Sequence, residues 1–287
     1  MSISDLAPST PASVTSQTVG LMSIDLLRRH LRIIAVVLAA ALVNQSATAD
    51  ELTDALIRYL VRDYARAIEM LTPLAEQGNA VAQVKLGIMY ARGEGVPPDS
   101  VTALRWLASA AEQGQTEAQF ELGVAHRDGL GTPVNGKLAM YWFQRAAEAG
   151  VAHACNAIGE MYLGHPDVPQ DYAAALVWFL RGAQEDDADS LYNIGLRYLL
   201  GQGVAPDEIE AYSWFDLAAA AGLGDLRSKA VTLRQAISER LTPMEVARAR
   251  TAAQDWLRRR DAASVTPEPL LRARRPAADT AASRHGD

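Results

Sequence analysis

Histidine and acidic side chains are the residues of this sequence whose types could do chemistry. Three histidines, His126, His153 and His165, lie in the central part of the chain, and Asp167 and Asp189 lie near them in the sequence. Imidazole and carboxylate groups can hold a zinc ion or transfer protons. No spacing forces a third and a fourth ligand together, so we expect no metal site. His126 occupies a position that the equivalent segments give to tyrosine, which favours a core residue over a ligand.

The sequence gives little support for cysteine chemistry or for nucleotide binding. Cys155 is the only cysteine, which excludes an intramolecular disulfide and a zinc site built from cysteines. The sequence contains no phosphate-binding loop, dinucleotide-binding glycine motif, H-E-x-x-H or G-x-S-x-G. We therefore predict no catalytic residue, no metal ligand and no cofactor. An enzyme would need an acid, a base and a nucleophile on one face, and no such set is visible.

Charge and composition exclude further classes. The chain has 27 Lys and Arg against 34 Asp and Glu, a net charge of −7, which argues against a nucleic-acid partner. With 49% hydrophobic residues it is neither wholly disordered nor a polytopic membrane protein. Residues 50–257 are net acidic and 258–287 net basic. An acidic surface would attract basic partners, with a scattered, solvated charge distribution as the alternative.

The first 49 residues have the pattern of an export signal. Residues 1–21 are rich in Ser, Thr, Pro and Ala, which predicts an unstructured lead-in, and Met22 can serve as the true start. Residues 22–49 contain a basic segment, the apolar stretch Ile33–Val43 and a small-residue cleavage sequence ending at Ala49. We expect cleavage after Ala49 and a periplasmic or secreted protein. An uncleaved signal anchor is the alternative, and it would be the chain's only membrane contact.

A period of 36 residues organises the rest of the chain. Leu or Ile, Gly, Tyr, Ala and Trp each recur at this spacing, which indicates stacked structural repeats. The recurring glycines are Gly87, Gly123, Gly159 and Gly195, and the recurring tryptophans are Trp106, Trp142, Trp178 and Trp214.

Each repeat predicts two helices, named helix A and helix B in chain order. Helix A contains the recurring glycine, helix B contains the recurring tryptophan, and a glycine-rich turn separates them. Helix B is expected to begin after a capping side chain and to end at a glycine. The expected caps are Asp99, Asn135, Asp171 and Asp207, and the expected final glycines are Gly78, Gly114, Gly150 and Gly222.

The glycines inside helix A need a packing reason, because glycine in a helix interior costs about 1 kcal/mol relative to alanine. We expect that helix A approaches its partner closely at Gly87, with Trp106 and Tyr90 filling the remaining space. The recurring aromatic residues are thus assigned to the core. Phe120, Tyr141 and Tyr192 are left as candidates for a carbohydrate-binding groove.

The pattern A-x-x-x-L-G-x-x-Y-x-x-G-x-G-V, a capping Asp, A-x-x-W and A-A-x-x-G resembles the Sel1-like repeat, a relative of the tetratricopeptide repeat. The resemblance implies an all-α fold, a right-handed α/α-solenoid. It divides the chain into an N-terminal cap and half repeat (50–78), four repeats (79–114, 115–150, 151–186, 187–222), a C-terminal capping helix pair (223–260) and a disordered tail (261–287).

Two segments depart from the regular pattern. In the third repeat, His165 and Asp167 replace turn glycines and Asp186 replaces the glycine after helix B, so this repeat is expected to bend differently. After residue 224, Thr242 to Glu245 form a capping box that opens the last helix.

The resemblance implies a scaffold or regulator that binds proteins in the bacterial cell envelope through a concave surface lined by helix A. The alternatives are a hydrolase of cell-wall or β-lactam type, although the paired cysteines of such relatives are absent, and an accessory protein for polysaccharide binding or secretion. Contact residues are expected at the helix-A positions that vary between repeats. They are Lys85, Met89, Arg92, Glu121, Asp128, Met161, Asn193 and Arg197.

Overall fold

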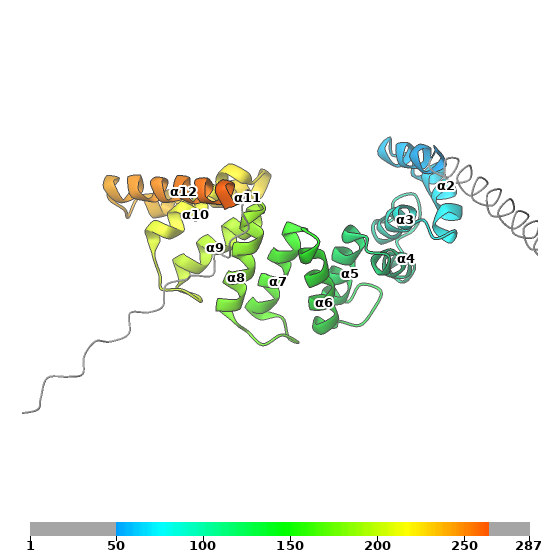
Figure 1. Ribbon diagram of the computed structural model, residues 1–287, viewed down its shortest axis with the longest axis horizontal. Coiled ribbons are helices and arrows are strands. Elements are labelled where there is room, and N and C mark those ends of the chain that lie inside the picture. Colours follow the sequence, from blue (N-terminus) through cyan, green and yellow to red (C-terminus); the bar gives the residue numbers. More distant parts are fainter. Residues whose placement is uncertain (1–49, 264–287) are drawn as a thin grey trace, which may run out of the picture. The chain divides into compact units, whose positions relative to one another are not determined.

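The computed structural model describes residues 50–263, which are helical with connecting turns and contain no strand in that range (Figure 1). The predicted lead-in, the signal segment and the tail from residue 264 lie outside the described residues. No helix between residues 50 and 263 is long and apolar enough to cross a membrane. Contacts divide the chain after Ala82 into unit 1 and unit 2.

Unit 1 contains a helical segment at residues 50–60, helix α2 (Tyr64–Glu76) and the first residues of α3 (Ala80–Arg92). In α2, Leu71 and Leu74 are buried. Asp63 precedes α2, but its side chain does not cap the helix. It lies 3.8 Å from Arg58 instead.

Unit 2 consists of the rest of α3 and nine further helices within the described residues. Each helix from α5 to α10 contacts the helices before and after it in the sequence, as in a stack of helix pairs (Figure 1). Helix A of the four repeats is α3, α5, α7 and α9, and helix B is α4, α6, α8 and α10. The bounds are α4 Ser100–Glu112, α5 Thr116–Asp128, α6 Gly136–Glu148, α7 Ala152–Gly164, α8 Tyr172–Gln184, α9 Ala188–Leu200, α10 Glu208–Ala221, α11 Gly224–Ser238 and α12 Pro243–Ala263.

The four predicted caps of helix B are confirmed. Each side chain accepts a hydrogen bond from a backbone N–H in the first turn, for example Asp207 Oδ1 from Ile209 N at 2.9 Å. Each cap residue also donates its own amide to the carbonyl nine residues earlier in helix A, including Asp171 to Tyr162 at 2.9 Å. The turn of the third repeat therefore closes as the others do, despite its different residues.

Helix B ends by a left-handed residue in three of the four repeats. Gly114 and Gly150 have φ of +88° and +89°, and Asp186 takes the same region with φ of +60°. The expected different bend at Asp186 is thus wrong at the end of helix B, because the aspartate adopts the conformation that the glycines have. Gly222 is not left-handed, since its φ is −70° and α10 continues to Ala221.

The helix-A glycines are sites of close approach, as predicted, but the residue that they accommodate is not tryptophan. A Cβ at Gly159 would lie 2.4 Å from the Phe179 ring, and one at Gly87 would lie 2.6 Å from Leu107. The contacting side chain therefore follows the recurring tryptophan by one residue. A step of one residue turns a helix by about 100°, so the two side chains lie on different faces. Of the four tryptophans only Trp214 is fully buried.

The C-terminal helix pair covers α10. Both α11 and α12 contact α10, and Trp214 lies 5.2 Å from Trp256 between ring centroids. The predicted capping box opens α12, because Thr242 N donates to Glu245 Oε2 at 2.8 Å and Glu245 N donates to Thr242 Oγ1 at 3.3 Å.

Candidate functional site

Five of the eight predicted contact residues keep exposed surface in unit 2. They are Lys85, Arg92, Glu121, Asp128 and Asn193. Met89, Met161 and Arg197 are buried, with exposed fractions of 0, 1 and 6%. The prediction that these three present an open surface is wrong, because their shared repeat position faces the interior.

In the third repeat the open face includes the position one residue before that of Met161. In the first repeat the open face contains Lys85 and, seven residues later, Arg92, while Ile88 between them is only 3% exposed. One repeat contributes a charged, exposed residue at this middle position, Glu160, where the others have Ile88, Val124 and Leu196. The name "helix-A face" is used below for the open positions of unit 2. Their residues are Lys85, Arg92, Glu117, Glu121, Arg127, Asp128, Glu160, Asp189 and Asn193.

Sequence analysis missed Arg127 and Glu160, although a signal for both is present. Arg127 occupies the position of Ala91, Leu163 and Leu199 in the other repeats. A charge at a position that is otherwise apolar is not needed for stacking the repeats, and at Arg127 and Glu160 it coincides with exposed surface.

Polar contacts on the helix-A face connect successive repeats. Lys85 Nζ lies 3.0 Å from Glu117 Oε2, which links α3 to α5. Asn193 Nδ2 donates to Asn156 Oδ1 at 2.8 Å, which links α9 to α7. Asn156 in turn donates to Glu160 Oε1 at 3.0 Å. These contacts link the first repeat to the second and the third repeat to the fourth.

Arg127 is the most constrained cation on this face. Its Nε and Nη2 donate to the two carboxylate oxygens of Asp128 at 2.7 and 2.9 Å. Its Nη1 lies 3.9 Å from Glu160 Oε2, so that it connects α5 to α7. The hydrogen bond raises the pKa of Arg127 and lowers that of Asp128. Both groups are therefore charged at neutral pH.

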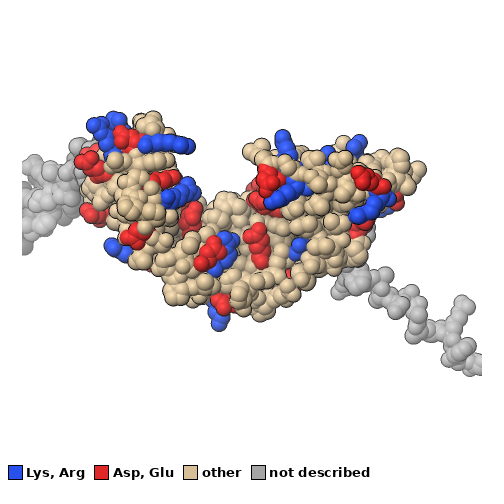
Figure 2. Space-filling model, turned by 180° about the vertical axis from the view of Figure 1, so that it is seen from behind, with Lys and Arg blue, Asp and Glu red and all other residues tan. Residues whose placement is uncertain are grey.

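Three carboxylates of the helix-A face are partly shielded from water by neighbouring atoms, although Glu160 and Asp189 keep exposed surface. Burial raises the pKa of Glu121, Glu160 and Asp189, one from each of α5, α7 and α9. Acidic and basic side chains are interspersed on the face of the molecule seen in Figure 2, with uncharged areas between them. The net acidity of the sequence is thus distributed rather than gathered on that face.

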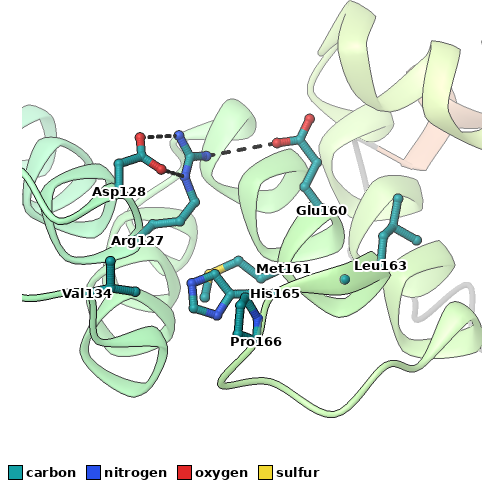
Figure 3. Close-up of a pocket in the computed structure, with 9 residues that line it drawn as sticks. Arg127, Asp128, Val134, Glu160, Met161, Leu163, His165 and Pro166 are labelled. Carbon is teal, nitrogen blue, oxygen red and sulfur yellow. Dashed lines mark hydrogen bonds and ion pairs between the residues drawn. The ribbon is translucent and has the colours of Figure 1, made fainter.

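An open pocket of about 690 Å³ lies beside the contact between Arg127 and Glu160. In Figure 3, Arg127 and Glu160 reach toward each other, and Met161 and His165 lie below them in that view. The pocket therefore combines a charged rim with apolar surface. Its lining residues are Arg127, Asp128, Val134, Glu160, Met161, Leu163, Gly164, His165 and Pro166.

The three histidines lie in different surroundings. His165 lines the pocket, and its Nδ1 accepts a hydrogen bond from Asp167 N at 3.1 Å. The ring of His153 packs edge-on against Phe120, with centroids 4.3 Å apart. Burial lowers the pKa of His126, which is partly buried as expected of a core substitute. Within residues 50–263, no three His, Cys, Asp or Glu residues come together as metal ligands could.

Cys155 and the predicted carbohydrate-contacting aromatics are mostly packed. Cys155 is 2% exposed, and burial raises the pKa of its thiol to about 11, so it is not a reactive thiolate at neutral pH. Phe120 packs against Phe143, and Tyr192 packs against Phe215. Tyr141 is 47% exposed but lies on α6, a helix B.

Comparisons with known proteins agree with this architecture. The Sel1 repeat model matches residues 58–79, 80–115, 116–151, 152–187 and 188–223. A Sel1 repeat protein from Oxalobacter formigenes is 31% identical over 62% of this chain and 71% of its own, with a TM-score of 0.56. The protective antigen c5321 of uropathogenic Escherichia coli, described as displaying an SLR fold, is 27% identical over 74% of this chain, with a TM-score of 0.61. The match spans only 47% of that antigen. No curated protein matches this chain. The chain belongs to the Sel1 repeat family.

Proposed function

We propose that this chain is an exported scaffold of the bacterial cell envelope, which binds a partner protein through the helix-A face of unit 2. Sel1 repeat proteins generally act as scaffolds for protein–protein interactions, typically without catalysis. The observation that carries the proposal is the pocket beside Arg127 and Glu160. It lies between the second repeat and the third, and the turn of the third repeat departs from the regular pattern.

The chemistry of the pocket suits a peptide segment. Protein interfaces combine an apolar centre with a polar, hydrogen-bonding rim, and arginine is enriched in them. Leu163 and Pro166 supply apolar surface, while Arg127 and Glu160 supply a donor and an acceptor. Because Asp128 holds Arg127 in place, little side-chain entropy is lost when a ligand binds.

Export is supported by the signal-like segment at residues 22–49, which lies outside the described residues. N-terminal sequencing of the chain recovered from the periplasm or the medium tests this part. We expect the mature chain to begin at Asp50. Recovery of the uncleaved chain from the cytosol alone would contradict export.

Photocrosslinking tests the binding face. Gly164 is the best probe position, because it lines the pocket and a Cβ built there meets no atom within 4 Å. Met89 is unsuitable, since it is fully buried. Val177 on α8 is 51% exposed and serves as the control on helix B. We expect one protein to be captured from Gly164 and not from Val177.

Charge variants then link capture to the pocket. The Arg127→Glu variant should lose capture from Gly164, because a cation on the rim is replaced by an anion beside Glu160. A matched change on helix B, Arg105→Glu, should leave capture unchanged, since Arg105 is exposed on α4. Equal capture in all variants would contradict the proposed face. Hydrolysis of a cell-wall substrate by the purified chain, with no capture, would favour the enzyme alternative.

A further inference from the structure

Arg197 on α9 is a buried cation without a partner. It is 6% exposed, and its Nε has no hydrogen-bond acceptor among the described residues. Among the described residues, no carboxylate acts on the charge of its guanidinium. Burying an unpaired charge is costly, and buried arginines are normally paired. Arg197 therefore costs the chain stability that an apolar side chain at this position would not.

Stacking of the repeats does not require this arginine. Met89, Ala125 and Met161 occupy the same position in the other repeats, and all three are buried. An apolar side chain thus satisfies the position three times in the same chain. The charge of Arg197, at the fourth occurrence of this position, is therefore not needed for stacking.

The end of the Arg197 side chain is the part that a ligand could reach, because of its nitrogens only Nε is both buried and without a hydrogen-bond partner. Met161, the equivalent residue one repeat earlier, lines the pocket described above. Burial lowers the pKa of Arg197, and Tyr172 at the start of α8 is the ionisable side chain that opposes this. The lowered pKa still leaves Arg197 charged at neutral pH, because the ordinary pKa of arginine lies far above neutral.

We propose that Arg197 anchors a second site on this chain, which binds a carboxylate of the partner peptide. A guanidinium presents a planar pair of N–H donors that matches the two oxygens of a carboxylate. The inference rests on the proposed function and adds to it the chemistry of the partner. The partner carries a carboxylate, either on an Asp or Glu side chain or at its C-terminus, one repeat along from the pocket.

Stability measurements on the purified chain test this without knowledge of the partner. The Arg197→Met variant restores the residue found at positions 89 and 161. We expect this variant to have a higher Tm than the wild-type chain in chloride, because it removes an unpaired buried charge. Replacing chloride by acetate at equal ionic strength should raise the Tm of the wild-type chain and leave that of Arg197→Met unchanged.

Arg105→Met is the matched control, because Arg105 is exposed on α4. It should respond to acetate as the wild-type chain does. Two results would overturn the proposal: a lower Tm for Arg197→Met in chloride, which would make the arginine a structural residue, or an equal acetate response with and without Arg197. Neither result bears on crosslinking from Gly164, so failure of this inference is distinguishable from failure of the proposed face.

The Arg197 Nε–H resonance in a ¹H–¹⁵N spectrum, assigned by its loss in Arg197→Met, distinguishes the sources of carboxylate. Acetyl-Ala-Glu-Ala-amide offers only a side-chain carboxylate, and acetyl-Ala-Ala-Ala offers only a C-terminal one. The peptide that shifts this resonance saturably at the lower concentration identifies the source. An equal shift with the uncharged acetyl-Ala-Gln-Ala-amide would overturn carboxylate recognition.

Discussion

Asp167 Oδ2 accepts a hydrogen bond from the Gly136 amide at 2.9 Å. The residue types at these two positions are the reverse of those at the equivalent positions of the other repeats. Elsewhere the turn residue is glycine and the residue that opens helix B carries a side chain. Gly131 lies against Ser100 in this way, and a Cβ at Gly131 would lie 2.3 Å from the Ser100 carbonyl oxygen. In the third repeat the turn residue carries the side chain, and the glycine opens α6.

Gly136→Ser should therefore destabilise the chain by about 1–3 kcal/mol, the usual cost of overpacking. A Cβ at Gly136 would lie 2.7 Å from both Asp167 Cβ and the His165 ring. Urea unfolding followed by circular dichroism measures the change. A free energy of unfolding equal to that of the wild-type chain would show that the turn yields without cost.

The double variant Gly136→Ser, Asp167→Gly should recover much of that loss, because it installs the pairing that Gly131 and Ser100 already have. The double-mutant cycle measures the coupling between the two positions directly. If the losses in free energy of unfolding of the two single variants simply add in the double variant, the two positions are not coupled and this interpretation is wrong. Ser100→Ala, at the equivalent position of another repeat, is the control that should show no coupling with Asp167→Gly.

Gly159→Ala tests the close approach of helix A to helix B. A Cβ there would lie 2.4 Å from Phe179, so we expect a loss of about 1–3 kcal/mol in the free energy of unfolding. Gly164→Ala, near the end of the same helix, is the matched control, because a Cβ at Gly164 meets nothing within 4 Å. It should be neutral or stabilising by about 0.4–1 kcal/mol. Equal effects of the two changes would contradict the packing role of Gly159.

The repeat fold was predictable because the same constraint appears four times. The caps at Asp99, Asn135, Asp171 and Asp207 needed only local rules, and all four are confirmed. The partner of Gly159 was not predictable from the lattice, since Trp178 and Phe179 both lie near it in sequence. Only the rotation of α8 relative to α7 decides which ring meets the glycine.

The candidate site was predicted less well than the fold. Variation between repeats indicated the right helices, but Met89, Met161 and Arg197 vary on the buried side of helix A. Variation alone does not distinguish an open position from an interior one that tolerates several apolar sizes. Arg127 and Glu160 also change from apolar to charged and keep exposed surface, whereas Arg197 makes the same change at a buried position, so only the structure separates the two cases.

Cys155 should be unreactive in the folded chain. Its thiol is 2% exposed and burial raises its pKa to about 11, so little thiolate exists at pH 8. Ellman's reagent should therefore react slowly with the native chain and rapidly with the urea-unfolded chain. Equally fast reaction of the native chain would mean that α7 opens readily or that the thiol is accessible.

Glu160→Gln should raise stability at neutral pH. Burial raises the pKa of Glu160 in the folded chain, so its ionised form is disfavoured on folding. The stability that the protonated carboxyl contributes is present below the unfolded pKa of about 4.3 and is lost as pH rises through the folded pKa. Glutamine does not ionise and can still accept the hydrogen bond from Asn156, and Arg127 keeps its hydrogen bonds to Asp128.

Urea unfolding at pH 7 and at pH 4 measures the effect. The free energy of unfolding of the variant should exceed that of the wild-type chain at pH 7, and the difference should shrink at pH 4. Glu148→Gln, at an exposed site on α6, is the control and should show no such pattern. A Glu160→Gln variant less stable than the wild-type chain at pH 7 would mean that the contact with Arg127 outweighs the cost of burying the carboxylate, and Glu160 would then be a structural residue of the helix-A face.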